Sequence, residues 1–222
     1  LATTVDFDGY PSELLSVEWR EGKPTLSQLK RPGRIHVWGG LSWRGKSRDL
    51  VFIGEEKARR HIYSIEDIED GEQGTLTQLT KGDVVVDHYS MDRKGRTLVA
   101  AIGTPTESTD LRVISSSGAM KAITNANPQV KTWRLPQLSV VSWKGKDGAT
   151  VEGVLELPPG YKAEDGPLPM LVQLHGGPTS AATYRFQYWI YGRGIFAAKG
   201  YAVFSPNYRG STGYGDTFMT QL

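Results

Sequence analysis

The pattern of hydrophobic and polar positions changes near residue 128. Before this point, short β-type segments are separated by turns rich in Gly, Lys and Asp. These segments are residues 14–17, 41–43, 49–54, 62–65, 89–91, 97–103, 111–114 and 120–124. After residue 128, residues 140–143 and 150–157 form an alternating pair. Residues 170–174 and 201–205 are instead short apolar runs without alternation, which predict strands buried on both faces of a sheet.

Two elements of the first part are repeated in the same order. The pentapeptide Thr-Leu-Ser-Gln-Leu at residues 25–29 returns as Thr-Leu-Thr-Gln-Leu at residues 75–79, and the strand pair at 41–54 returns at 89–103. Four short strands in units of 40–50 residues are typical of β-propeller blades. We therefore expect residues 1–127 to form the last blades of a propeller: the end of one blade to about residue 30, then blades at 31–80 and 81–127. An unclosed β-sandwich is the alternative.

The second part predicts a different architecture. A helical stretch around residues 195–199 ends at Gly200, a residue type that commonly terminates helices, and the strand at 201–205 is expected to stop at Pro206. Strand, loop, helix and strand in succession begin a parallel α/β sheet. The expected fold class is thus mixed, with an α/β domain starting in residues 128–222.

Composition and charge exclude several classes of function. The 222 residues carry a net charge of +2, spread evenly, so a nucleic-acid partner is not expected. The basic clusters at 31–34 and 57–60 are interpreted as solvated turns. No run reaches the ~18 apolar residues of a membrane-spanning helix, and no cysteine or metal-ligand spacing occurs, so neither metal nor cofactor is expected. We expect a soluble protein, with the cytoplasm and the periplasm or exterior both open.

The most informative motif is His175-Gly176-Gly177-Pro178, which lies between a predicted strand and a predicted helix. Paired glycines permit a sharp turn and leave a backbone N–H unshielded by a Cβ atom. In α/β-hydrolases, an N–H of the loop after the third strand is one donor of the oxyanion hole, which stabilises the charge of the tetrahedral intermediate. A tight strand-to-helix turn without catalysis is the alternative.

Four motifs in order resemble the opening of the catalytic domain of the prolyl oligopeptidase family. They are the Trp-Lys hairpin at 143–148, Leu-Pro-Pro-Gly-Tyr at 157–161, His-Gly-Gly-Pro at 175–178 and Asn-Tyr-Arg-Gly-Ser-Thr-Gly-Tyr-Gly at 207–215. The similarity is greatest to the acylaminoacyl-peptidase and dipeptidyl-peptidase-like branch. That family places a propeller before its hydrolase domain, in agreement with the interpretation of the first part.

The resemblance implies roles for a few residues. The N–H of Gly177 would be the oxyanion donor, with His175 and Gly176 in the same active-site loop. The prolyl oligopeptidase branch has a tyrosine hydroxyl where this chain has His175, so here the backbone donor would act without it. Arg209 resembles an arginine that braces the loops of the active site, and a structural ion pair is the alternative for it.

The nucleophile motif of the family, Gly-x-Ser-x-Gly, does not occur in the sequence. Because the triad follows the chain order Ser, Asp, His in α/β-hydrolases, all three residues are expected beyond Leu222, and His175 is not the base. His36, His61 and His88 are expected to be surface or packing residues. We therefore expect the chain to be an internal piece of a larger enzyme, poorly soluble and inactive when expressed alone.

The expected function is that of a serine peptidase that hydrolyses short peptides through an acyl-enzyme. An esterase or amidase on the same scaffold, and a propeller binding module with a degenerate hydrolase domain, are the alternatives. A peptide substrate is expected, and homo-oligomerisation is left open. Dipeptidyl peptidases bind the substrate amino terminus with paired glutamates, but Glu55 and Glu56 are interpreted here as part of a solvated hairpin.

Overall fold

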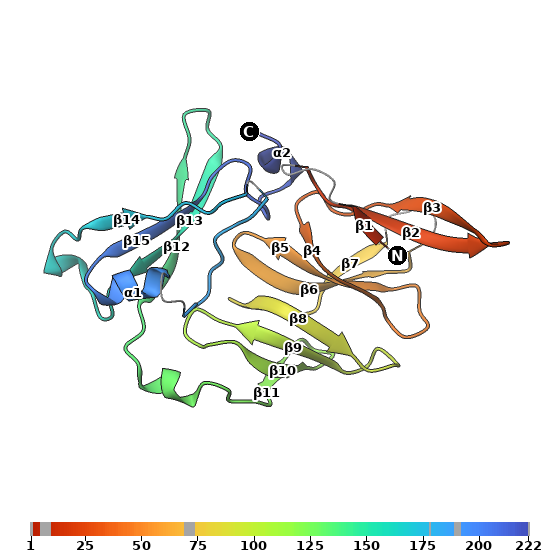
Figure 1. The fold of residues 1–222 in the computed structure, drawn as a ribbon, viewed down its shortest axis with the longest axis horizontal. Coiled ribbons are helices and arrows are strands. Elements are labelled where there is room, and N and C mark those ends of the chain that lie inside the picture. Colours follow the sequence, from red (N-terminus) through yellow and green to blue (C-terminus); the bar gives the residue numbers. More distant parts are fainter. Residues whose placement is uncertain (1, 5–9, 69–73, 178, 189–191, 222) are drawn as a thin grey trace.

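The computed structural model of the chain is mostly β-strand with little helix, and it describes residues 2–4, 10–68, 74–177, 179–188 and 192–221 (Figure 1). The strands are β1 (Ala2–Thr4), β2 (Glu13–Arg20), β3 (Lys23–Leu29), β4 (His36–Trp43), β5 (Leu50–Glu56), β6 (Arg59–Glu66), β7 (Thr75–Gln78), β8 (Val85–Met91), β9 (Leu98–Gly103), β10 (Asp110–Ile114), β11 (Met120–Ala122), β12 (Gln137–Lys144), β13 (Thr150–Leu157), β14 (Met170–Val172) and β15 (Ala202–Asn207). The helices are α1 (Arg193–Ala198) and α2 (Asp216–Met219), with short 3₁₀ turns η1 (Pro128–Thr132) and η2 (Ala163–Asp165).

The strands form three sheets. The first contains β1, β2 and β3, the second contains β4 to β11, and the third has the order β12-β13-β15-β14. In Figure 1 the first and third sheets lie on opposite sides of the second. The second sheet consists of two antiparallel four-stranded groups, β4–β7 and β8–β11, which a single parallel bridge between Arg60 and Val85 connects. These groups are propeller-like sheets.

The sequence repeats fall on equivalent strands of these sheets. The pentapeptide at 25–29 lies in β3, the outer strand of its sheet, and the copy at 75–79 begins in β7, the outer strand of the next group. The second repeated element occupies β4–β5 in one group and β8–β9 in the other. The repeats therefore mark structurally corresponding positions.

The centre of the second sheet is densely packed because β5 and β6 are buried on both faces. Phe52 and Tyr63 stack with their ring centroids 5.8 Å apart. Gly54 lies where a Cβ atom would come within 2.5 Å of Ile35 Cγ2 and 2.7 Å of the Tyr63 ring. Only glycine fits there without moving its neighbours.

The third sheet combines antiparallel and parallel pairing. β13 pairs with β12 and β15 in antiparallel fashion, whereas β14 and β15 are parallel. The predicted helix is confirmed as α1, and Gly200 follows it with φ +92°. β15 does not stop at Pro206 but continues to Asn207. Pro206 is accommodated because β14 pairs with β15 only up to Phe204, so no strand on that side needs the missing N–H.

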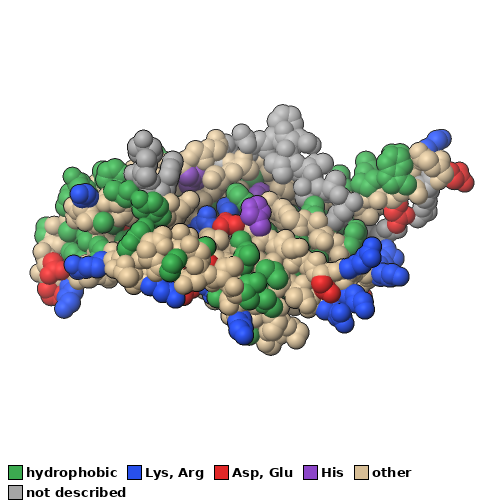
Figure 2. All heavy atoms as spheres, turned by 60° about the horizontal axis from the view of Figure 1, so that its bottom comes forward, with side chains coloured by type: hydrophobic (Ala, Val, Ile, Leu, Met, Phe, Trp, Pro, Cys, Tyr) green, Lys and Arg blue, Asp and Glu red, His purple; other side chains and the backbone are tan. Residues whose placement is uncertain are grey.

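The prediction that residues 170–174 form a strand buried on both faces was wrong. β14 is the edge strand, and Met170, Val172 and Leu174 are 59%, 54% and 66% exposed. Exposure alternates along this segment, because Leu171 and Gln173 on one face are half-buried whereas Met170, Val172 and Leu174 on the other are exposed. Hydrophobic side chains are numerous at this end of the molecule, at the left of Figure 2, where acidic and basic groups lie among them.

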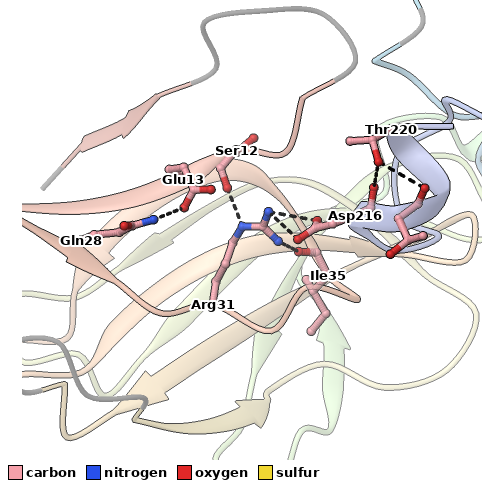
Figure 3. A network of polar contacts seen from close by, with 8 residues as sticks. Ser12, Glu13, Gln28, Arg31, Ile35, Asp216 and Thr220 are labelled. Atoms are coloured by element: carbon pink, nitrogen blue, oxygen red, sulfur yellow. Dashed lines mark hydrogen bonds and ion pairs between the residues drawn. The ribbon is translucent and has the colours of Figure 1, made fainter. Parts of the chain in front are cut away.

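The basic cluster at 31–34 is not simply a solvated turn. The Arg31 side chain is only 6% exposed and contacts both Asp216 carboxylate oxygens at 3.0 Å. It also donates to the carbonyl oxygens of Ser12 and Ile35 (Figure 3). Arg31 therefore connects the first sheet and the start of β4 to α2 near the end of the chain. Among the described residues, no helix is long and apolar enough to cross a membrane.

One buried histidine should make stability depend on pH. His61 is 5% exposed, and burial, followed by the nearby Arg59 charge, lowers its pKa from 6.5 to about 4. Below pH 6.5 the unfolded chain takes up a proton that the folded chain excludes, so stability falls as the pH drops towards 4. His61→Gln should remove about 3 kcal/mol of the pH 7-to-4 difference in unfolding free energy.

Urea unfolding at pH 7 and pH 4 measures this difference, and His88→Gln at an exposed position is the matched control. Equal pH dependence in wild type and His61→Gln would contradict the assignment.

Candidate functional site

The loop that contains His175, Gly176 and Gly177 (the His175 loop) follows β14 and packs against the segment after β15. The rings of His175 and Tyr208 are stacked with their centroids 4.5 Å apart and 13° between their planes. The Tyr208 hydroxyl donates to the His175 carbonyl oxygen, and His175 Nε2 lies 2.9 Å from Ser211 Oγ. The ring and backbone of His175 are thus both held by the segment 208–211.

The hydrogen bonds indicate which ring nitrogen carries the proton. His175 Nδ1 lies 3.0 Å from the Gly176 carbonyl oxygen, which can only accept. In the neutral imidazole, Nδ1 is then the donor and Nε2 the acceptor, so the Ser211 hydroxyl donates to Nε2. This arrangement fixes the ring relative to its own loop.

The pairing of Ser211 with His175 is not that of a nucleophile with its base. Ser211 is completely buried, whereas a nucleophile must reach a substrate carbonyl. The other nitrogen of His175 contacts the neighbouring Gly176 carbonyl instead of a carboxylate that would orient a base. The contact is therefore structural.

Gly177 has a backbone conformation that favours glycine. Its φ is +135°, and a Cβ atom there would lie 2.6 Å from the Thr179 nitrogen. At Gly176, by contrast, a Cβ atom would meet nothing within 4 Å. The two glycines are exposed, so the backbone of this loop is open to an approaching ligand.

Asn207, the last residue of β15, anchors the other side of the site. Its side-chain oxygen accepts from the Ala182 N–H at 2.7 Å, and its amide nitrogen donates to the Ala182 carbonyl at 3.0 Å and to the Tyr214 hydroxyl at 2.8 Å. Asn207 is fully buried, and all these contacts satisfy its amide. These hydrogen bonds connect the end of β15, the segment after the His175 loop and the Gly-rich segment at 210–215.

The Gly-rich segment also contacts the hairpin between β5 and β6. The Thr212 hydroxyl donates to Glu55 Oε1, while Arg60 Nε donates to Glu55 Oε2 at 2.7 Å. The Lys57 N–H donates to the Gly213 carbonyl at 2.9 Å. The interpretation of Glu55 as a residue of a solvated hairpin was wrong, because its exposed fraction is 0% and Arg60 is buried too. Glu56 is partly exposed and pairs with Arg34.

Arg209 points to another part of the third sheet. Its guanidinium forms an ion pair with Asp147 in the turn between β12 and β13, and both side chains are substantially exposed. The structure thus brings Arg209 to that hairpin, while its neighbours Tyr208 and Ser211 contact His175. A role for Arg209 in bracing an active site stays a prediction.

A cavity of about 160 Å³ lies beside the His175 loop, lined by residues that include Gln173, His175, Thr183, Arg193 and Ser205. Arg193, from α1, is 8% exposed and forms a 2.7 Å ion pair with Glu156 of β13. Burial raises the pKa of Glu156, and the Arg193 charge opposes that shift. The buried Ser205 Oγ has no hydrogen-bond partner among the described residues.

The motifs indicate the two loops but not the contacts between them. Asn207, Tyr208, Ser211 and Thr212 enter the sequence interpretation only as members of a motif, and Glu156 does not enter it. No group of three or more histidine, aspartate or glutamate side chains in the described part of the chain could hold a metal ion.

Sequence comparison finds relatives of the chain among known peptidases. Over 151 residues the chain is 31% identical to dipeptidyl aminopeptidase BIII of Pseudoxanthomonas mexicana, covering 64% of the chain and 21% of that protein. Over 195 residues it is 27% identical to the human acylamino-acid-releasing enzyme, covering 81% of the chain and 25% of that protein. The chain is a homologue of the acylaminoacyl and dipeptidyl peptidases of the prolyl oligopeptidase family. No family model matches it.

Solved structures show the same fold. The chain superposes on the acylaminoacyl peptidase of Pyrococcus horikoshii with a TM-score of 0.71 at 21% identity, covering 95% of the chain and 30% of that structure. A puromycin-hydrolysing peptidase of Mycobacterium tuberculosis gives a TM-score of 0.61 at 22% identity, with coverage of 95% and 33%. The chain spans about a quarter of the length of the curated relatives named above.

The buried ion pair between Glu156 and the cavity-lining Arg193 should be important for stability. Glu156→Gln leaves the Arg193 charge buried without a compensating carboxylate, a change that typically costs about 3–5 kcal/mol. Asp83→Asn removes the same charge from the much more exposed pair with Arg59 and should cost less than about 1 kcal/mol. Urea unfolding of the two variants provides the comparison, and equal losses would show that the burial of Glu156 has no energetic consequence.

Proposed function

We propose that the protein carrying this chain is a serine peptidase that hydrolyses short peptides through an acyl-enzyme. In this proposal residues 1–127 form the last blades of a β-propeller and residues 128–222 form the start of an α/β-hydrolase catalytic domain. The chain supplies the oxyanion loop, with the N–H of Gly177 as a donor. The proposal assigns the Ser-Asp-His triad to parts of the whole protein outside these 222 residues.

The observation that carries the proposal is the position and conformation of the His175 loop. It follows the carboxyl end of β14, which runs parallel to β15, and in the proposed α/β domain ligands would bind beyond the carboxyl ends of such strands. The loop is exposed at Gly176 and Gly177, while the His175 ring and carbonyl are held from below. A fixed loop with an open glycine backbone suits a preorganised donor of the oxyanion hole.

The printed names of the relatives support a peptide substrate. The relatives are named a dipeptidyl aminopeptidase and an acylamino-acid-releasing enzyme, and we extend a peptide substrate to the present protein. The propeller-like sheets beside the proposed catalytic domain would restrict access to small peptides.

A fluorophosphonate probe tests the catalytic class directly, because it reacts only with an activated serine. The whole natural protein should be labelled once, at a serine outside residues 1–222. Labelling of Ser205 or Ser211 would mean that the nucleophile has been assigned to the wrong segment. The absence of labelling would favour a binding module with a degenerate hydrolase domain.

A comparison of the two glycines tests the oxyanion assignment. Gly177→Ala places a Cβ atom 2.6 Å from the Thr179 nitrogen at φ +135°, so the loop and its N–H must move. We expect kcat to fall by about 10²-fold with KM little changed, since the oxyanion exists only during the reaction. Gly176→Ala meets no atom within 4 Å and should reduce kcat much less.

Both glycine variants are assayed with one chromogenic peptide in protein whose melting temperature stays within a few degrees of wild type. Gly177→Pro provides a second test, because it removes the N–H altogether and, since proline fixes φ near −65°, also moves the backbone away from φ +135°; we expect kcat to fall by at least about 10²–10³. A folded Gly177 variant with wild-type kcat would refute the assignment of the oxyanion donor.

A further inference from the structure

We propose that Glu55 and Thr212 are positioning residues for the His175 loop, so that the β5–β6 hairpin fixes the geometry of the oxyanion loop. This inference rests on the proposed function and deepens it. The proposal is that they act through Ser211 and the His175 ring.

Glu55 carries a fully buried carboxylate. Its carboxylate is 0% exposed, and an ionised carboxylate can be buried at acceptable cost only when it is paired and hydrogen-bonded. Arg60, on the adjacent strand, pairs with Oε2, and the Arg60 guanidinium in turn lies 3.3 Å from the centre of the Trp38 ring. Oε1 accepts from the Thr212 hydroxyl.

Three hydrogen bonds hold Thr212 and the residue after it. Besides the side-chain bond to Glu55, its N–H donates to the Ser180 carbonyl at 3.1 Å, and the next residue, Gly213, accepts from the Lys57 N–H. Gly213 has φ +81°, and a Cβ atom there would lie 3.1 Å from Glu55 Cγ. The segment therefore packs directly on the glutamate side chain, and its position depends on that side chain.

Ser211 connects this segment to the proposed oxyanion loop. Ser211 precedes Thr212 in the chain, is itself fully buried, and donates to His175 Nε2. A displacement of Thr212 must therefore move Ser211, and with it the donor that fixes the His175 ring. Because catalytic donors must be held within about 0.5 Å of their productive position, a small displacement here is expected to affect the rate.

The test replaces Thr212 by valine, which has the same shape but no hydroxyl. Thr132→Val is the matched control, since Thr132 is exposed and its hydroxyl donates only to the nearby Gln129 carbonyl. In the whole natural protein we expect Thr212→Val to lower kcat at least tenfold with KM within about twofold. Thr212→Ser, which restores the hydroxyl, should recover most of kcat, a result that a purely structural role of the methyl group would not give.

Hydrogen exchange measured by mass spectrometry provides a readout that needs no catalysis. Peptides that cover residues 170–177 should exchange faster in Thr212→Val than in Thr132→Val, although the substitution is more than thirty residues away in sequence. If the wild type neither turns over substrate nor reacts with the probe but the loop loosens in this way, the proposed function fails and the positioning role stands.

Three results would overturn the positioning role while leaving the proposed function intact. They are a Thr212→Val variant with wild-type kcat, unchanged exchange in the His175 loop, or no recovery in Thr212→Ser. If Thr212→Val does not fold, Glu55→Met combined with Arg60→Met removes the acceptor and both buried charges together, which is commonly tolerated. The same loss of kcat and loosening of the loop are expected for that double variant.

Discussion

The buried carboxylate of Glu55 is the constraint on which the arrangement of the two loops depends. Removing a carboxylate from water is costly unless each oxygen finds a donor. Arg60 is local and is available as soon as the β5–β6 hairpin forms. The second donor, Thr212, lies 157 residues further along the chain. Both oxygens of the Glu55 carboxylate therefore have these donors only when the Gly-rich segment packs against the hairpin.

The other links between the second sheet and the last part of the chain follow the same principle. Arg185 donates to both oxygens of Asp87 in β8, and Arg31 does the same with Asp216. In each pair a single guanidinium nitrogen, Nη1 of Arg185 or Nη2 of Arg31, contacts both carboxylate oxygens, and the arginine is the more buried partner. Such bonds specify how the segments meet more than they add to stability.

Backbone hydrogen bonds also join the second sheet to the last part of the chain. The Tyr184 N–H donates to the Ala58 carbonyl at 2.7 Å, and the Phe186 N–H donates to the Thr104 carbonyl at 2.8 Å. The segment after the His175 loop is thus bonded to the ends of two strand pairs in the second sheet. Because backbone groups carry little sequence signal, these contacts could not be anticipated from residue types.

Much of the local structure could be predicted from the sequence. The strand segments, the repeat of corresponding strands and the helix before Gly200 follow from period-two patterns and turn residues, which act over a few positions. The errors concern burial. Arg31 and Glu55 look like solvated charges because their partners Asp216 and Thr212 are distant in sequence. The apolar run at 170–174 does not reveal that its strand lies at an edge.

The candidate site shows why its supporting contacts matter. Gly176 and Gly177 open the backbone to a ligand, but glycine has the largest conformational freedom in the unfolded chain and gives the loop no rigidity of its own. Rigidity must come from His175, the adjacent side chain, whose ring is stacked on Tyr208 and bonded to Ser211. Since Ser211 and Thr212 are consecutive, the segment that holds this ring also satisfies Glu55. A residue of a propeller-like sheet can therefore determine how well an exposed glycine loop in another sheet is ordered.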